Sequence, residues 1–158
     1  MARLPRTLGA ALRIHPYSPT DLHDVVVVWH ESKRRAFPYV EIQQSYTMQD
    51  DESHFRDVVA KDCQVWVAED EGVIQGFIAM KAYLIDQLFV RVGSQRSGVG
   101  ASLLGKARQI SPKTLRAYTF RKNVAARAFF EKEGFVMVAE GVSPPPENEP
   151  DLLYSWRP

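Results

Sequence analysis

The chain has 158 residues, of which 45% are hydrophobic and 25% are charged, and its formal net charge is +1. This length and composition are typical of one globular domain with its own core, and the near-neutral charge argues against a dedicated nucleic-acid-binding protein. A single cysteine, Cys63, excludes an internal disulfide and suits a reducing compartment. The sequence contains no run of the ~18 apolar residues that a membrane span requires.

The N-terminal segment is a poor signal peptide, because Arg13 interrupts its short apolar stretch. We expect residues 1–9 to form a loose leader, residues 10–158 to form one domain, and the protein to be cytoplasmic. Cys63 begins an apolar segment and has no histidine beside it. We therefore interpret this cysteine as a small residue at a strand start rather than as a nucleophile.

The first part of the chain predicts a strand followed by a helix. Residues 11–15 are a short apolar segment, which we expect to be the first strand. Residues 18–21 combine capping side chains, an early proline and an acid, which is typical of a helix start. We predict a helix over residues 20–35, although the four valines at 25–28 favour a strand by propensity.

An aromatic-rich segment and a second helix come next. Residues 37–49 predict an irregular connection. The acids at positions 50–52 predict a helix start, because negative charge is favourable at a helix N-terminus. We expect Phe55, Val58 and Val59 on the inner face of this helix.

The rest of the chain alternates strands with two helices, one after Gly98 and one capped by Asn123 and ended by Gly134. A hairpin turn is expected at 70–72. The predicted strands are 63–68, 73–81, 84–92, 114–120, 135–140 and 151–156. This order predicts an α/β domain with a mixed, mostly antiparallel sheet of about six to seven strands, with about four helices on both faces.

The stretch from Tyr83 to Ile110 reads as a buried strand, a glycine-bearing turn and a helix. In this arrangement the first helical N–H groups have no partner within the helix, and the helix dipole places partial positive charge there. Gly98 and Gly100 allow an anion to approach the backbone closely. We interpret the turn as a cradle for a phosphate or pyrophosphate.

Three phosphate-binding motifs compete for this turn. The dinucleotide pattern G-x-G-x-x-G fails, because its third glycine would fall on Leu103. A Walker-type pattern matches Gly100, Gly105 and Lys106, but Ala107 stands where a magnesium-binding Ser or Thr is needed. The third pattern, Q/R-x-x-G-x-G/A, is matched in full by residues 95–100.

With its preceding strand and its following Leu-Leu helix, the hexapeptide at 95–100 resembles the acyl-CoA-binding motif of the GNAT-type N-acetyltransferase superfamily. A second stretch, Asn123-x-x-Ala126-x-x-Phe129-Phe130 followed by Gly134-Phe135, resembles the other signature of that family. The two signatures stand in the family's order and are separated by one strand. The family's order of elements fits nearly the whole chain, from Ala11 to Arg157.

The resemblance implies acetyl-CoA as donor substrate and requires no metal. It implies a cleft between the central strand and strand 114–120, in which backbone groups of the central strand pair with the pantetheine arm as an added strand would. The cofactor-binding residues implied by the resemblance are Leu88, Phe89, Val90, Gln95, Arg96, Ser97, Gly98, Val99, Gly100, Ala101, Asn123, Phe129 and Phe130. Basic residues near the two motifs suit the phosphates of CoA, namely Arg91, Arg96, Lys106, Arg121, Lys122 and Arg127.

Acyl transfer to an amine needs a base, a stabilised oxyanion and a way for the thiolate to leave. A backbone N–H near Phe89 and Val90 is expected to stabilise the oxyanion by donating a hydrogen bond to it. Asp86 is a candidate base, because strand alternation predicts it on the face of Leu88 and Val90, where an isolated carboxylate has a raised pKa. A structural Asp satisfied by a partner is the alternative, and Glu41 is the rival base.

The position of the proton donor departs from the family pattern. Many relatives carry a tyrosine at the second aromatic position of the second motif, whereas this chain has Phe130, which has no proton to give. Ser94, Tyr118 or water would then protonate the thiolate, or the thiolate leaves unaided. Phe130 also motivates an alternative function, a non-catalytic acyl-CoA-binding sensor, and the Walker-type match motivates a weaker one, a nucleotide-phosphate-binding domain.

We expect the acceptor to be a primary amine, carried by a small molecule or a protein. Aromatic and acidic residues before and within the second helix would form a mouth suited to a cation, or would simply pack the loop. These residues are Phe37, Tyr39, Glu41, Tyr46, Asp50 and Asp51. We expect no nucleic-acid or membrane partner, and a homodimer is compatible with the sequence.

Overall fold

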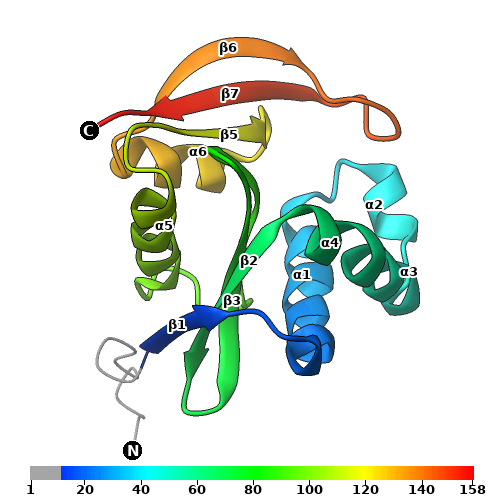
Figure 1. The fold of residues 1–158 in the computed structure, drawn as a ribbon. Coiled ribbons are helices and arrows are strands. Elements are labelled where there is room, and N and C mark those ends of the chain that lie inside the picture. The colour runs from blue at the N-terminus through cyan, green and yellow to red at the C-terminus, as the bar shows by residue number, and fades with distance from the viewer. Residues whose placement is uncertain (1–11) are drawn as a thin grey trace, which may run out of the picture.

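A seven-stranded sheet in the order β1-β2-β3-β4-β5-β7-β6 forms the centre of the fold (Figure 1). The computed structural model describes residues 12–158, so the expected leader at 1–9 lies outside the described residues. Every neighbouring pair of strands is antiparallel except β4 and β5, which are parallel. The strands are β1 (Leu12–Pro16), β2 (Gln64–Asp70), β3 (Val73–Lys81), β4 (Leu84–Val90), β5 (Leu115–Phe120), β6 (Val136–Val142) and β7 (Pro150–Trp156).

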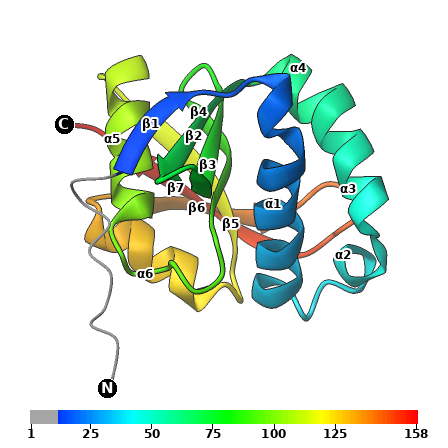
Figure 2. The same cartoon turned by 90° about the horizontal axis from the view of Figure 1, so that it is seen from below.

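Helices cover both faces of the sheet, with α5 and α6 on one side and α1 to α4 on the other (Figure 2). The helical elements are η1 (Pro19–Asp21), α1 (Leu22–Ala36), α2 (Glu41–Ser45), α3 (Met48–His54), η2 (Phe55–Val59), α4 (Ala60–Asp62), α5 (Val99–Ile110) and α6 (Val124–Lys132). The mixed α/β fold predicted from the sequence is confirmed.

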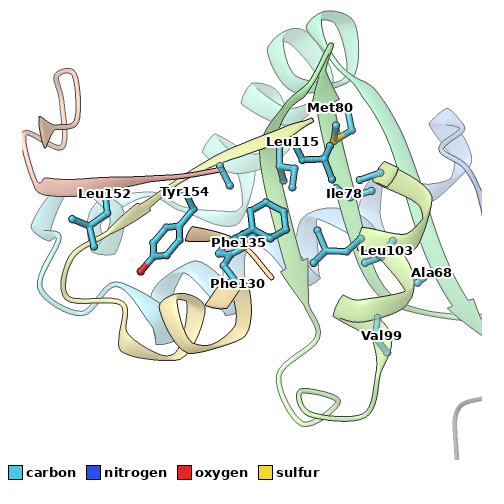
Figure 3. Packing of buried hydrophobic residues seen from close by; sticks show 14 residues of the cluster. Ala68, Ile78, Met80, Val99, Leu103, Leu115, Phe130, Phe135, Leu152 and Tyr154 are labelled. Carbon is cyan, nitrogen blue, oxygen red and sulfur yellow. The ribbon is translucent and has the colours of Figure 1, made fainter. Parts of the chain in front are cut away.

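Each face of the sheet has its own hydrophobic core. The core under α5 and α6 joins β3 to β5 and β7, and Figure 3 shows the rings of Phe130, Phe135 and Tyr154 gathered within it. The core under α1 contains Val25 and Val28, which are fully buried. The valine-rich segment is therefore a helix, because burying its inner face outweighs a strand propensity worth only tenths of a kcal/mol per residue.

The segment between α1 and α3 is more ordered than the sequence predicts. We expected an irregular connection over residues 37–49, but a short helix, α2, forms within it. The next helix begins at Met48 rather than at position 50. Thr47 caps it, since the Thr47 hydroxyl accepts from the Asp50 N–H and the Asp50 carboxylate accepts from the Thr47 N–H.

The prediction for Val58 was wrong. Phe55 and Val59 are buried as expected, whereas Val58 is 39% exposed. The element η2 is a turn of π-helix, which has more residues per turn than an α-helix. In this wider turn, residues four apart share a face more closely than residues three apart, so Val58 turns toward solvent.

Two remaining expectations about the fold can be compared with the structure. Strand β4 ends at Val90, two residues earlier than predicted, where the turn toward α5 begins. Within residues 12–158, every helix is too short or too polar to span a bilayer. The same part of the chain holds no group of three or more His, Cys, Asp or Glu side chains arranged to hold a metal ion.

Candidate active site

The parallel strands β4 and β5 separate soon after they pair. Their ladder contains only the pairs Leu84 with Arg116 and Ile85 with Ala117. Beyond these pairs the strands diverge and a cleft of about 780 Å³ opens between them. It is lined by residues 84–89 of β4, by 117–120 of β5, and by side chains of α6, β6 and the β6–β7 loop. The cleft expected between these two strands is therefore present.

Beyond Ile85 the edge of β4 away from β3 has no β5 partner, although the Val90 carbonyl accepts from the Ser32 hydroxyl at 3.0 Å. The Arg91 N–H donates to the Gln75 carbonyl of β3, 2.7 Å away. In an antiparallel ladder, successive residues alternate between facing the partner strand and facing away from it. Leu88 and Val90 therefore direct their backbone groups away from β3, whereas those of Phe89 point to β3, and of the first two Leu88 lines the cleft. This orientation corrects the expectation that all three residues offer backbone groups to a ligand.

A β-bulge places Asp86 differently from the sequence prediction. Met80 pairs with Ile85 and Ala79 pairs with Gln87, so Asp86 has no residue opposite it in the ladder. The extra residue breaks the alternation of β4. Asp86 consequently does not share the face of Leu88 and Val90, as we had expected, and lies toward the α1 side of the sheet.

The Asp86 carboxylate has several neighbours and is not isolated. It accepts a hydrogen bond from the Gln87 amide at 3.3 Å, and Lys81 Nζ lies 3.8 Å from its other oxygen. Cys63 Sγ lies 3.7 Å away. Burial, followed by the charge of Asp86, raises the pKa of Cys63 to about 12. A thiol this basic is not a nucleophile at neutral pH, in agreement with our interpretation of Cys63.

The glycine turn leads into the N-terminus of α5, as predicted. Gly98 precedes the helix with φ at 91°, in the left-handed region that glycine adopts without strain. No described side chain caps this helix start, and its first turn contains no acid. The N–H groups of Val99, Gly100 and Ala101 are thus without intrahelical partners and remain open to an anion.

The other residues of the hexapeptide lie in the exposed turn before α5. Gln95, Arg96 and Ser97 are exposed, and the Ser97 hydroxyl donates to the Ser94 carbonyl. The Walker-type interpretation is excluded by position, because Gly105 and Lys106 lie inside α5 rather than in a loop.

Most of the basic residues that we expected near CoA already have partners. Lys106 lies over the Trp66 ring at 3.7 Å, Arg91 donates to the Ile74 carbonyl, and Arg121 pairs with Glu140 at 3.2 Å. The Arg127 guanidinium donates to the Arg121 carbonyl. Arg96 and Lys122 are the exposed members of the set whose side chains form no ion pair with another of residues 12–158. Lys122 lies 5.3 Å from the centre of the Tyr39 ring.

The second motif lies against the cleft and against the first motif. Asn123 caps α6 by accepting from the Ala126 N–H at 3.2 Å, and both residues line the cleft. Phe130 also lines the cleft and is almost completely buried. Phe129 does not line it but packs on Gly100 of α5. Of the side chains considered as proton donors, Tyr118 lines the cleft, whereas Ser94 donates to Gln75 outside it.

The acidic residues at the mouth of the cleft are not the ones that the sequence predicted. Glu41 is exposed and is not among the cleft-lining residues. Asp50 is used in the cap of α3, and Asp51 is buried between Lys33 and His30. The acids near the mouth come instead from the opposite end of the chain. Glu147 in the β6–β7 loop accepts from the Gln43 amide of α2 at 2.9 Å.

Aromatic rings form one wall of this mouth. Phe37 packs edge-on against Phe120 with ring centres 4.9 Å apart, and both residues line the cleft with Phe89. Tyr39 packs behind them, 6.2 Å from Phe120. Burial and the charge of Glu149 raise the pKa of Tyr39 to about 12. The aromatic part of the predicted mouth is therefore present, while Glu147 had no local sequence signal.

Comparison with known proteins identifies the family. The profile of the acetyltransferase (GNAT) domain family matches residues 61–137. The chain is 30% identical over 131 residues to the uncharacterized N-acetyltransferase YafP of Escherichia coli, covering 82% of this chain and 84% of YafP. It is 28% identical over 120 residues to the peptidyl-lysine N-acetyltransferase YiaC of the same organism, covering 75% of this chain and 80% of YiaC.

Solved structures support the fold assignment. The PaiA N-acetyltransferase of Thermoplasma acidophilum, determined in complex with coenzyme A, superposes with a TM-score of 0.70 at 19% identity. The match covers 92% of this chain and 98% of that protein.

A mixed sheet with a splayed parallel pair, beside a glycine turn that opens a helix, defines an acyltransferase of the acetyl-CoA-dependent kind. The chain belongs to the GNAT acetyltransferase family, and it is an N-acetyltransferase that uses acetyl-CoA. This assignment confirms the resemblance seen in the two motifs and favours an enzyme over a non-catalytic sensor.

Proposed function

We propose that this enzyme acetylates a primary amine that is a cation before it reacts. The charge of the cleft carries this proposal. Four carboxylates line it, from Asp86, Glu140, Glu147 and Asp151, and none of the described residues that line it is Lys, Arg or His. Asp86 and Glu140 have Lys81 and Arg121 beside them, outside the lining, so the excess negative charge comes from Glu147 and Asp151. Carboxylates in a partly enclosed cleft attract a cationic substrate and raise its local concentration.

The donor binds along β4 and at the start of α5 in this proposal. The backbone groups of Leu88 pair with a pantetheine amide, and the open N–H groups of Val99, Gly100 and Ala101 hold the pyrophosphate. Gln95, Arg96, Ser97 and Gly98 complete the turn around it. Asn123 and Phe130 form the opposite wall of the cleft, and Phe129 packs on Gly100 beside the pyrophosphate site. The fold similarity to PaiA, whose structure contains coenzyme A, supports this arrangement.

Acetyl-CoA supplies an activated acetyl group, and the chain's own groups supply the proton transfers. Asp86 accepts a proton from the ammonium, and the amine nitrogen attacks the thioester carbon. The Val90 N–H, which points away from β3, stabilises the oxyanion. The C–S bond then breaks and the thiolate takes a proton from a donor group. The amide nitrogen passes its extra proton to that donor, which is thereby restored, and Asp86 releases the first proton to water. We favour Asp86 over Glu41 as base, since Glu41 does not line the cleft.

Tyr118 is the side chain that we propose as proton donor to the thiolate. It lines the cleft on β5, next to Ala117, which forms the last β4–β5 pair. Phe130 has no hydroxyl, and the Ser94 hydroxyl donates to Gln75 outside the cleft.

The acceptor class that best suits the mouth is an alkyl ammonium such as a lysine side chain. Its apolar stem packs on Phe37 and Phe120, and its charge pairs with Glu147. Similarity to YiaC, a peptidyl-lysine N-acetyltransferase, supports lysine within a peptide as the first acceptor to test.

The test is release of CoA thiol from acetyl-CoA by the full chain, with a panel of amines. The panel contains a lysine-bearing peptide, its arginine counterpart, an alkyl diamine and an anionic amino acid. We expect turnover with the lysine peptide or the diamine. Turnover confined to the anionic amine would contradict the proposed acceptor class.

A pair of variants tests the contact with the acceptor. Glu147→Gln is expected to raise KM for the amine while KM for acetyl-CoA stays unchanged. Glu31→Gln is the matched control, because Glu31 is exposed on α1 and does not line the cleft. Equal KM values for the amine in both variants would show that Glu147 does not contact the acceptor.

A homodimer and a cytoplasmic location remain predictions from the sequence.

A further inference from the structure

The side chain of Gln87 connects the proposed base to helix α1. Gln87 Oε1 accepts from the Trp29 indole N–H at 3.2 Å, and Gln87 Nε2 donates to Asp86 Oδ2 at 3.3 Å. An indole nitrogen is a donor only, so the amide oxygen must face Trp29. The amide NH₂ group is thereby left facing the carboxylate. The orientation of the amide is thus set by its partner on α1.

Trp29 is itself held from several sides. Only 3% of the residue is exposed. Lys33 Nζ lies 3.5 Å from the centre of the ring, the Phe55 ring packs edge-on at 5.6 Å, and the His54 ring stacks at 5.8 Å. The indole N–H therefore has a fixed position from which to orient the Gln87 amide.

We propose that Gln87 is a positioning residue for Asp86, and that Trp29 keeps the Gln87 amide in the orientation that donates to the carboxylate. The inference rests on the proposed role of Asp86 as base. The bulge leaves Asp86 without a residue opposite it in the ladder, so its carboxylate is held by side chains. The Gln87 amide holds Oδ2, so the proton of the acceptor amine goes to Oδ1, whose neighbour is the half-exposed Lys81 ammonium 3.8 Å away.

The charged and titratable neighbours of Asp86 come from two elements. Lys81 of β3 lies 3.8 Å from Oδ1, and the Cys63 thiol before β2 lies 3.7 Å from Oδ2. Asp62 precedes Cys63 and adds a weaker negative charge beside the thiol. A hydrogen bond donated to a carboxylate favours its ionised form, which is the form that accepts a proton.

The test compares Gln87→Leu, Trp29→Phe and the double variant with the wild-type chain, using acetyl-CoA and the best amine from the panel. We expect Gln87→Leu to lower kcat about tenfold or more, with KM for acetyl-CoA unchanged. In the pH profile of kcat/KM, the acidic limb should move to higher pH, because the charged carboxylate has lost a hydrogen-bond donor. Trp29→Phe keeps a smaller aromatic ring, loses the N–H, and should produce the same shift to a smaller extent.

The double variant tests whether Gln87 and Trp29 act together, and its result differs from the one expected if the two residues only stabilise the fold. In the Gln87→Leu background, Trp29→Phe should leave kcat and the acidic limb unchanged, since the amide that it orients is gone. Gln64→Leu is the matched control, as Gln64 is exposed at the start of β2. Thermal unfolding of each variant separates loss of folded protein from loss of turnover.

The outcomes distinguish this inference from the proposed base. If Asp86→Asn is as active as the wild type, Asp86 is not the base and the positioning role falls with it. If Asp86→Asn is inactive but Gln87→Leu keeps the wild-type kcat and the wild-type acidic limb of the pH profile, the proposal that Asp86 is the base is retained. The proposal that Gln87 positions it is then wrong. A drop in kcat that only follows a lower folded fraction, with the acidic limb fixed, also overturns the positioning role.

Discussion

Gly100 in the first turn of α5 packs on the ring of Phe129 in α6, so closely that a Cβ added at Gly100 would lie 3.1 Å from that ring. The two sequence motifs therefore meet in space at the start of α5. The contact sets how near α6 comes to the N–H groups that we propose as the pyrophosphate site. A side chain at position 100 would have to displace an aromatic wall of the donor site.

The first prediction concerns this contact. Gly100→Ala should weaken acetyl-CoA binding about fivefold or more, because overpacking of this kind typically costs about 1–3 kcal/mol. Gly105→Ala is the matched control on the same helix, since nothing lies within 4 Å of its added Cβ. Alanine is favoured over glycine in a helix by about 1 kcal/mol, so Gly105→Ala should raise Tm. Calorimetric titration with acetyl-CoA and thermal unfolding measure both effects, and equal affinities would contradict the first.

The second prediction uses Cys63 to report on Asp86. Burial and the Asp86 charge raise the pKa of Cys63 from 9.0 to about 12, so the folded protein keeps the thiol protonated and alkylation is slow. Asp86→Asn should lower this pKa and speed alkylation by iodoacetamide at a fixed, mildly alkaline pH. Asp62→Asn is the control with a smaller expected effect, because Asp62 is the weakest contributor. Identical alkylation rates in the two variants would argue against the contact between Asp86 and Cys63.

The same pKa difference has a consequence for stability at high pH. Because the folded-state pKa of Cys63 is raised above its unfolded value, the folded state binds the proton more tightly. This contribution to stability is complete below pH 9.0 and is lost as pH rises toward about 12. Cys63→Ser should reduce this alkaline loss in urea unfolding experiments, and an unchanged pH dependence would contradict it.

The third prediction concerns the buried ion pair between α1 and α3. Lys33 Nζ lies 2.8 Å from Asp51, and His30 Nδ1 lies 2.7 Å from the other oxygen of that carboxylate. Burial lowers the pKa of Lys33 although Asp51 opposes this. Asp51→Asn leaves the ammonium without its counter-charge and should cost about 3–5 kcal/mol in urea unfolding. Asp57→Asn breaks an exposed pair with Arg56 and should leave Tm unchanged.

The fourth prediction tests Tyr118 as the proton donor. Tyr118→Phe should lower kcat, with ~10²-fold as the expected scale for loss of a positioned acid, and should leave KM for acetyl-CoA unchanged. Tyr83→Phe is the control, because Tyr83 is also an exposed tyrosine but lies at the β3–β4 turn outside the cleft. If both variants keep the wild-type kcat, water protonates the thiolate or the thiolate leaves unprotonated.

Local patterns in the sequence predicted most of the fold. The glycine turn, the Asn123 cap, the start of α1 and the strand β3 all lie where their residues indicate, because each depends on neighbours within a few positions along the chain. The two motifs were enough to indicate the family for the same reason. The sequence did not predict the α2 helix or the exposure of Val58. The α2 segment has no periodicity that distinguishes it from a loop, and the segment around Val58 has none that distinguishes a π-helical turn from an α-helix.

The sequence by itself determined the order of elements, the position of the glycine turn and the class of enzyme. Tertiary structure alone decided which acids reach the cleft and how the proposed base is held. Glu147 meets Gln43 across 104 positions, and Trp29 meets Gln87 across 58. A bulge in β4, defined only by its pairing with β3, sets the side of the sheet on which Asp86 lies. Such contacts depend on how distant segments pack together, and the local periodicity of a sequence carries no record of them.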